Sequence, residues 1–530
     1  MSSQSVNQVI DYMSNQYQRI FPNGPSPVVT VSAAVAASTL AWSLARPSKK
    51  RPANAPPLVP HYIPYIGNGL ELQRDPAAFI KRCKEQYGPV FEIMAFGRKQ
   101  VVLTGEYILE CFRAGDSYLD FNAGVEDSLP LSRILALSYD KQERKTGPSY
   151  DNSKSPLVRA IRNNFKTHQL DKYQERIEYA VNRGLDLDIT FEQGKDTTVL
   201  DMSSVQRMIG RISALIFAGD EIGENEELIE AMATFAQSII SSAIAYMVFP
   251  IYVADTIVKR YLSIGPHIEI IMRYMTPVLS KIQKKEEEEG QQLQPTFFMH
   301  NVMHTPNPDG TMQTAQEAAF TLQDVTFASI HTTSTFSILA LHTLSDRPDL
   351  QVKIRQELEK AKQQLGEITP GNIKNIPIMD SFFREILRIN SDYIGIHHKA
   401  LQDTMLSNGI VIPKGSSVGL AANDAHTDPG IQELGPNNIP LIEVDPERFI
   451  TRKTKKSTAI GLDMLAFGVG YHACPGRYLA SQEITYVIAK ILEQYDISPI
   501  TSNGMRAPNR LALGIMQLVP AQGVKLTKRK

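Results

Sequence analysis

The residues best placed to do chemistry surround Cys474, in a segment that reads Phe-Gly-Val-Gly-Tyr-His-Ala-Cys-Pro-Gly from Phe467 to Gly476. Apolar residues recur at helical spacing after it, so Cys474 is expected in a tight loop directly before a helix. Amide groups and the dipole of a helix N-terminus favour a thiolate. Glycines let the backbone pass close to a flat ligand, and a thiolate held there is a candidate axial ligand of haem iron. A small buried cysteine in a turn is the alternative that one cysteine beside glycines would favour.

A second group of polar residues interrupts an apolar stretch from Thr314 to Leu344, which contains neither Gly nor Pro. A helix of that length, apolar on nearly all sides, is expected to cross the centre of a large domain. Its middle reads Ala-Ser-Ile-His-Thr-Thr-Ser from Ala328 to Ser334. Hydroxyls and an imidazole are costly there unless they have partners. The alternative to a functional role is that each hydroxyl donates to the carbonyl one turn earlier.

The cysteine string fits Phe-x-x-Gly-x-x-x-Cys-x-Gly-x-x-x-Ala, which resembles the haem-binding signature of the cytochrome P-450 superfamily. The resemblance implies that Cys474 is the thiolate ligand of haem b. It also implies that Phe467 lies beside the cofactor.

The mid-chain string resembles the superfamily segment Ala-Gly-x-Asp/Glu-Thr-Thr, which lines the oxygen site. Thr332 falls on the oxygen-activating threonine, whose role is to deliver protons. Ser329 replaces the usual glycine and His331 replaces the usual acid. A histidine can relay protons near neutral pH. We therefore expect either a relay role or a structural role for His331, with Thr332 as the catalytic residue.

A Glu-x-x-Arg motif at Glu385 and Arg388 precedes Pro-Glu-Arg-Phe, which contains Arg448. Positions three apart on a helix share a face and can pair. An isolated pair of this kind is common, but both motifs are spaced as in the superfamily. The resemblance implies that Glu385, Arg388 and Arg448 form a buried charge network behind the haem.

Three further residues are candidates to bind the haem propionates. The superfamily has a Trp-x-x-x-Arg pattern where this chain has Val-Arg-Ala-Ile-Arg, so Arg162 matches the arginine, the tryptophan is missing and Arg159 is a rival. A guanidinium suits a carboxylate because it can pair bidentately. His398 and His472 stand where the superfamily often has arginine, which implies propionate-facing roles for both.

Composition, charge and cysteine content argue against several classes of protein and site. The chain has 530 residues, is 42% hydrophobic and carries a formal net charge of -1, so it shows no sign of nucleic-acid binding. Its three cysteines are widely spaced, which argues against a disulfide framework and against a cysteine zinc site. A reducing, cytosol-facing environment fits this content.

The N-terminal region predicts a membrane anchor. Residues 21–45 carry no charge, and four basic residues follow between Arg46 and Arg51. Positive residues after an apolar run favour a helix that spans the membrane with the main body in the cytosol, whereas a secretory signal would carry them before it. We expect a tail at 1–27, a single transmembrane anchor at 28–45, a basic, proline-rich hinge at 46–62 and a catalytic haem domain at 63–530. The resemblance to microsomal enzymes places the protein in the endoplasmic reticulum membrane.

Local patterns predict the elements around these motifs. We expect a helix over 75–87 with Asp75 at its cap, a hairpin from strands at 90–94 and 100–104, and a turn at Asn408-Gly409. A loop over 115–156 is expected to form one wall of the substrate pocket, and a helix is expected over 157–170. The apolar run at 239–254 is too short for a second membrane span. The resemblance implies that this region is a lid over the substrate channel. The basic cluster Thr451–Lys456 would suit docking of an acidic reductase.

Together these features predict a mainly α protein with small β-sheets, one large cytochrome P-450 fold behind an N-terminal anchor. The resemblance implies a monooxygenase that takes electrons from NADPH through NADPH–cytochrome P-450 reductase and inserts one oxygen of O2 into a lipophilic substrate. The mid-helix string is similar to that of fungal enzymes such as ent-kaurene oxidase, which suggests a terpenoid or meroterpenoid in secondary-metabolite biosynthesis. The alternatives are a haem-thiolate isomerase or dehydratase that uses no O2, and a non-catalytic haem-binding protein.

Overall fold

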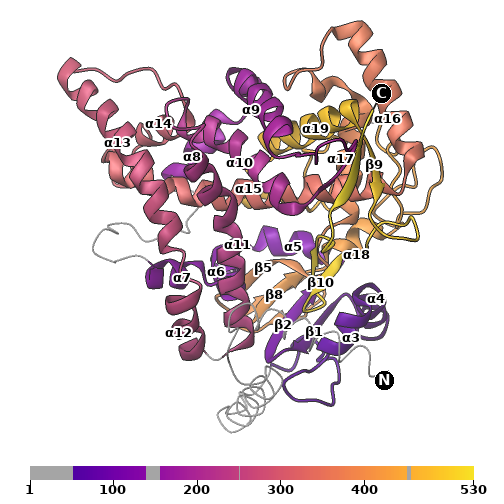
Figure 1. The fold of residues 1–530 in the computed structure, drawn as a ribbon. Helices are drawn as coiled ribbons and strands as arrows, with labels where there is room; N and C mark the ends of the chain where they lie inside the picture. Colours follow the sequence, from indigo (N-terminus) through magenta and orange to yellow (C-terminus); the bar gives the residue numbers. More distant parts are fainter. Residues whose placement is uncertain (1–51, 139–154, 250, 451–454, 530) are drawn as a thin grey trace.

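The computed structural model describes residues 52–138, 155–249, 251–450 and 455–529 (Figure 1). The predicted tail, the anchor and the first part of the hinge lie outside the described residues, as does most of the basic cluster at 451–456. The described chain is mainly helical with small sheets, which confirms the predicted fold class.

The helices before the central one are α3 (Gly69–Arg74), α4 (Pro76–Tyr87), α5 (Tyr107–Ala114), α6 (Phe121–Ser128), α7 (Leu131–Ser138), α8 (Pro156–Asn164), η2 (Thr167–Tyr173), α9 (Gln174–Leu187), α10 (Met202–Ala218), α11 (Glu226–Val248), α12 (Ile251–Tyr261), α13 (Gly265–Glu289) and α14 (Phe298–Met303). From the central helix onward they are α15 (Ala315–Ser345), α16 (Pro348–Leu365), η3 (Ile373–Asn375), α17 (Pro377–Ile389), α18 (Ala422–Thr427), η4 (Gly470–His472) and α19 (Arg477–Gln494). The strands are β1 (Val90–Ala95), β2 (Arg98–Leu103), β3 (Leu119–Asp120), β4 (Thr197–Leu200), β5 (Gly395–Ala400), β6 (Thr404–Met405), β7 (Val411–Ile412), β8 (Ser417–Leu420), β9 (Tyr495–Pro499), β10 (Arg510–Ala512), β11 (Met516–Leu518) and β12 (Val524–Lys528).

Helix α15 crosses the middle of the molecule, as its apolar pattern predicts (Figure 1). It is 31 residues long and begins with a capping box, in which the side chains of Thr314 and Glu317 each accept a backbone N–H of the other residue. Helices α10, α11, α13 and α19 pack against it. Most of its side chains are buried in the largest hydrophobic core, so the helix is a fixed support for the polar residues in its middle.

The five-stranded sheet has the order β1-β2-β8-β5-β3. Strands β1 and β2 form the predicted antiparallel hairpin, and β8 runs parallel to β2. Strand β5 pairs antiparallel to β8, with a register shift between Gly395 and His398. The predicted cap of α4 is present, because the Asp75 side chain accepts the N–H of Ala78. The turn at Asn408-Gly409 joins β6 to β7, and Gly409 supplies its positive φ of 80°.

Two local predictions are wrong. The described part of the predicted loop over 115–156 holds β3, α6 and α7, because Asp120 caps α6 and the apolar residues Ile134 and Leu135 of α7 enter a core with α11 and α12. The predicted helix over 157–170 ends at Asn164, and a separate 3-10 helix follows from Thr167. The Ala160 carbonyl accepts the Asn164 side chain, which competes with the helical ladder there.

Helix α11 contains the span Glu226–Tyr246, which is long and apolar enough to cross a membrane. It is the one such helix among the described residues, and 61% of its most apolar window is buried inside the molecule, as in a core helix. The chain leaves α11 at Phe249, which is extended because Pro250 follows it. Helix α12 then begins at Ile251, so the predicted lid region is a pair of helices.

Candidate functional site

The cysteine loop is a closed turn that delivers Cys474 to the start of α19. Gly468 and Gly470 have φ values of 67° and 68°, which residues with a Cβ rarely adopt. The Cys474 N–H donates to the Phe467 carbonyl at 2.8 Å, and Arg477 donates to the Cys474 carbonyl at 2.7 Å. Cys474 is therefore held by one backbone hydrogen bond and by the Arg477 side chain, in the position before α19 that the sequence predicts.

Cys474 differs from the other two cysteines in its exposure. Cys83 and Cys111 are buried, and burial raises the pKa of each thiol, that of Cys83 to about 11. Cys474 is partly accessible. Cys474 is therefore the one of the three cysteines that a ligand from outside the polypeptide can reach.

Burial also raises the pKa of Cys474, while the amides of Gly476 and Arg477 and the charge of Arg477 lower it by less. The loop amides therefore favour the thiolate, as predicted, but burial, which the prediction left out, outweighs them. A coordinating metal deprotonates a thiol outright, so a bound iron would supply what the amides do not.

The middle of α15 is accessible although the helix lies in the centre of the molecule. Ala328 and Thr332, one turn apart, are exposed, while Ile330 and Thr333 beside them are buried. The Thr332 hydroxyl donates to the Ala328 carbonyl at 2.7 Å, which is the back-bonding that the alternative interpretation expects. An exposed strip on a central helix requires an open space next to it, and α15 packs on α19, the helix that follows the cysteine loop.

Several polar groups of α15 lack a partner. Among the described residues, no hydrogen-bond partner contacts the buried Oγ atoms of Ser329 and Ser334 or the Nδ1 atom of His331. Burial lowers the pKa of His331, so its ring is neutral at pH 7. Back-bonding therefore accounts for Thr332 and leaves its neighbours unsatisfied. Unpaired polar atoms beside an accessible strip fit a site that binds a ligand.

Arg162, and not its rival Arg159, reaches the cysteine loop. Its guanidinium donates to the Tyr471 carbonyl at 2.8 Å, and its central carbon lies 4.4 Å from the centre of the Tyr471 ring. Arg159 donates instead to the carbonyl of Pro306. Helix α8 therefore presents Arg162 to the segment that carries Cys474.

His398 and His472 both contact one aromatic ring, that of Phe121. The Phe121 ring centre is 5.6 Å from that of His398 and 5.0 Å from that of His472. The Nε2 atom of His472 lies 2.7 and 2.9 Å from the two carboxylate oxygens of Asp116. His398 is buried, and burial lowers its pKa to about 4, so it stays neutral at physiological pH.

Arg162, His398 and His472 are thus brought together around the cysteine loop, through Tyr471 and Phe121. The sequence did not single out Asp116 or Phe121, which lie in the stretch predicted to be a loop. A lone Asp and a lone Phe carry no spacing that could have indicated this role.

Glu385, Arg388 and Arg448 form a fully buried ion-pair network. Arg388 donates to the two carboxylate oxygens of Glu385 at 2.6 and 3.0 Å, and Arg448 donates to one of them at 3.0 Å. The remaining guanidinium N–H groups donate to backbone carbonyls, those of Leu434, Ile439, Pro440, Leu441, Glu443 and His426.

The network connects to the cysteine segment through His426. The His426 carbonyl accepts from Arg388, and its Nε2 atom accepts the N–H of Leu465 at 2.7 Å. Leu465 stands two residues before Phe467, so the network supports the base of the loop.

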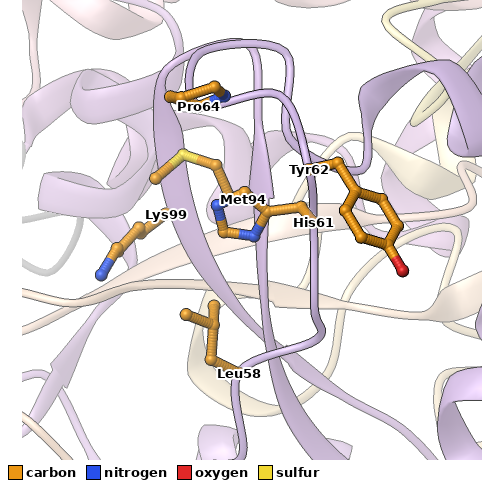
Figure 2. A pocket seen from close by; sticks show the side chains of 6 residues that line it. All are labelled: Leu58, His61, Tyr62, Pro64, Met94 and Lys99. Carbon is orange, nitrogen blue, oxygen red and sulfur yellow. The ribbon is translucent and has the colours of Figure 1, made fainter. Parts of the chain in front are cut away.

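An open hollow beside β1 is separate from this site (Figure 2). It is lined by Leu58, His61, Tyr62, Pro64, Met94 and Lys99. None of the predicted site residues takes part in it.

The family model "Cytochrome P450" matches residues 56–526. The chain belongs to the cytochrome P450 family. Members of this family hold haem iron through a cysteine thiolate. The accessible thiol of Cys474, the exposed strip on α15 and the cationic group Arg162 beside the loop fit that cofactor.

Individual relatives are distant. Cytochrome P450 monooxygenase paxP of Penicillium paxilli is 25% identical over 314 residues, which cover 58% of this chain and 60% of that protein. Cytochrome P450 monooxygenase 103 of Postia placenta is 25% identical over 507 residues, or 91% of this chain and 94% of that protein. The retinoic acid-bound cyanobacterial CYP120A1 has a TM-score of 0.65 at 20% identity and covers 90% of this chain. That likeness supports the fold.

Proposed function

We propose that the protein is a haem-thiolate monooxygenase with Cys474 as the axial ligand. The observation that carries the proposal is the pairing of an accessible thiol before α19 with the exposed Thr332 strip on α15, which packs against α19. When bound, haem would supply oxygen activation and the insertion of one oxygen atom into the substrate.

The chain's own residues would bind the cofactor and control protons. Arg162 would pair with one propionate, and His398 and His472, which both contact Phe121, would hydrogen-bond to the propionates. Both histidines are weaker partners than arginine, because His398 is neutral and His472 also faces Asp116. Phe467 would close the loop beneath the cofactor, since its carbonyl holds the Cys474 amide.

Thr332 would donate and accept protons at the open side of α15. Its hydroxyl hydrogen points to the Ala328 carbonyl, so its oxygen lone pairs are available to accept a proton donor. His331 has a neutral ring with an unpartnered Nδ1 among the described residues, which suits a relay that passes protons without holding charge.

The substrate that we propose is a lipophilic terpenoid or meroterpenoid of fungal secondary metabolism. The partly buried Phe327 and Phe336 flank the exposed strip and give it an apolar border.

Electrons would come from NADPH through a reductase. Lys455 and Lys456 of the basic cluster form ion pairs with Asp463 and Asp380, so part of the charge available to a reductase is already compensated. The single-pass anchor in the endoplasmic reticulum would keep the enzyme beside that membrane-bound reductase.

The ligand assignment is tested with the reduced, CO-bound protein. We expect the thiolate-haem Soret band from the native chain and from Cys83→Ala, since Cys83 is fully buried away from the loop. We expect Cys474→Ser to lose the band. A Cys474→Ser variant that kept it would overturn the assignment.

The reaction class is tested by reconstitution with a reductase and terpenoid precursors. A monooxygenase consumes NADPH and labels its product from 18O2. Product formed at the same rate without NADPH would instead establish an isomerase or dehydratase.

A further inference from the structure

Two histidines and a glutamate converge where α13 meets α14, away from the cysteine loop. Glu286 lies in the last turn of α13, while His300 and His304 stand one turn apart at α14. The Oε1 atom of Glu286 lies 3.3 Å from Nε2 of His300 and 2.8 Å from Nε2 of His304. The three ligand atoms are all within 4.8 Å of one another. The set contains no cysteine.

The three side chains are largely shielded from solvent. Their exposed fractions are 12% for Glu286, 3% for His300 and 13% for His304. The backbone N–H of Leu293 also donates to the same Glu286 oxygen, at 2.8 Å. Among the described residues, the buried Nδ1 of His300 has no partner. The pocket is thus a fixed arrangement of three donor atoms and not a chance meeting of surface side chains.

The charge of this cluster suits a divalent cation. Hydrogen bonds from Leu293 and the two histidines hold the pKa of Glu286 below its usual value despite burial, so its carboxylate is ionised. Burial and the neighbouring His304 lower the pKa of His300, which keeps its imidazole neutral and able to bind a metal. The ionised carboxylate places a negative charge beside two imidazoles in a nearly closed site.

We propose that Glu286, His300 and His304 bind a zinc-type divalent transition-metal ion. Two imidazoles and one carboxylate are a ligand set that Zn²⁺ accepts, with water in a fourth position. Bonds of about 2.0–2.1 Å at tetrahedral angles place ligand atoms about 3.3 Å apart. The 3.3 Å between Glu286 and His300 matches this spacing, and the 2.8 Å between Glu286 and His304 is shorter than it, so His304, at the end of α14, would move slightly away from the carboxylate.

A metal here would fasten the end of α13 to α14. Helix α14 packs against α15 and α8, and the Phe298 ring lies 4.6 Å from that of Phe165, which follows α8. The ion would stabilise this corner of the molecule, and its contribution would not depend on the haem chemistry.

The test measures bound zinc per chain. The full chain, purified with a tag that lacks histidine, is stripped with EDTA, equilibrated with Zn²⁺ alone, freed of unbound ion and analysed for metal. We expect one zinc per chain in the native protein and at least a fivefold loss in Glu286→Gln and His304→Gln. His168→Gln, which alters an exposed histidine, is the matched control and is expected to retain one zinc.

X-ray absorption at the zinc edge provides a measurement on the native chain alone. We expect nitrogen and oxygen ligands with imidazole scattering and no sulfur. Equal zinc content in the native chain, Glu286→Gln and His304→Gln would overturn the proposal, as would a sulfur ligand. Addition of Zn²⁺ should also raise the Tm of the native chain and of His168→Gln, and leave that of Glu286→Gln unchanged.

Discussion

Two buried polar regions of this protein differ in whether their polar groups have hydrogen-bond partners. In the network of Glu385, Arg388 and Arg448, the guanidinium groups find a carboxylate and a set of backbone carbonyls. In the middle of α15, the side chains of Ser329 and His331 leave atoms with no partner among the described residues.

This difference indicates that the ion-pair network stabilises the fold and that the middle of α15 contributes to the reaction. A buried polar group without a partner costs roughly 1–3 kcal/mol, so a chain that keeps several of them uses them for a ligand. The network has no such atoms to offer, because its charges are matched inside the fold. We therefore expect changes in the network to unfold the protein and changes in α15 to alter the reaction.

The largest effect is expected from Glu385→Gln. It leaves the buried Arg388 and Arg448 without their counter-ion, and breaking a buried pair in this way costs roughly 3–5 kcal/mol. We expect a matching drop in the free energy of unfolding in urea and loss of the thiolate-haem band. Glu71→Gln is the control, since Glu71 and Arg82 pair at 2.8 Å with exposed fractions of 57% and 44%. It should cost no more than about 1 kcal/mol. Similar losses for both variants would remove the distinction between the two regions.

Thr332→Ala tests the other side of the comparison. General acid–base groups contribute at least roughly 10²-fold, so product formed per NADPH should fall by about that factor. Stability should change by less than about 1 kcal/mol, because the side-chain hydrogen bond lost within the described part of the chain is the exposed one to Ala328. Thr332→Ser should restore most of the coupling. Thr321→Ala, which removes the same kind of back-bond to Glu317 on the same helix, should keep the native coupling. Normal coupling in Thr332→Ala with lowered stability would make Thr332 structural.

The fold class was implied by the resemblance to the cytochrome P-450 superfamily, and the long helix α15 was predictable because its stretch is apolar on nearly all sides and contains neither Gly nor Pro. The hairpin of β1 and β2 and the cap at Asp75 were predictable because each depends on neighbours in sequence. The helices α6 and α7 were missed. Helix α7 packs on α11 and α12 and helix α6 packs on β5, contacts that a sequence of scattered Gly, Ser and Asp does not reveal.

Some residues of the candidate site could be predicted from the sequence and others could not. Cys474 and Thr332 stand in strings whose spacing is specific, so the sequence could indicate them. Asp116 and Phe121 reach His472 from more than 300 positions away, and only the folded chain brings them there. The sign of the Cys474 pKa shift was also out of reach, because it depends on how far burial outweighs the loop amides.

The smallest predicted effect concerns His426, which joins the network to the cysteine segment. Burial lowers its pKa to about 3. Its Nε2 atom accepts the Leu465 N–H at 2.7 Å, so protonation would replace this acceptor with a donor. An unfolded histidine has a pKa of about 6.5. The stabilisation by the neutral ring is therefore fully present above pH 6.5 and is lost as the pH falls from there toward 3.

At pH 5.5 this single group should cost about 1.4 kcal/mol relative to its effect at neutral pH. The measurement is the urea midpoint of unfolding as a function of pH, for the native chain and for His426→Asn. We expect the variant to be less stable at pH 7.5 but to lose stability less steeply between pH 6.5 and 5.5. His168→Gln, which alters an exposed side chain far from the network in sequence, is the control and should keep the native slope. Equal slopes in all three proteins would mean that the ring of His426 is protonated in the folded state, and the network would then reach the cysteine loop by another contact.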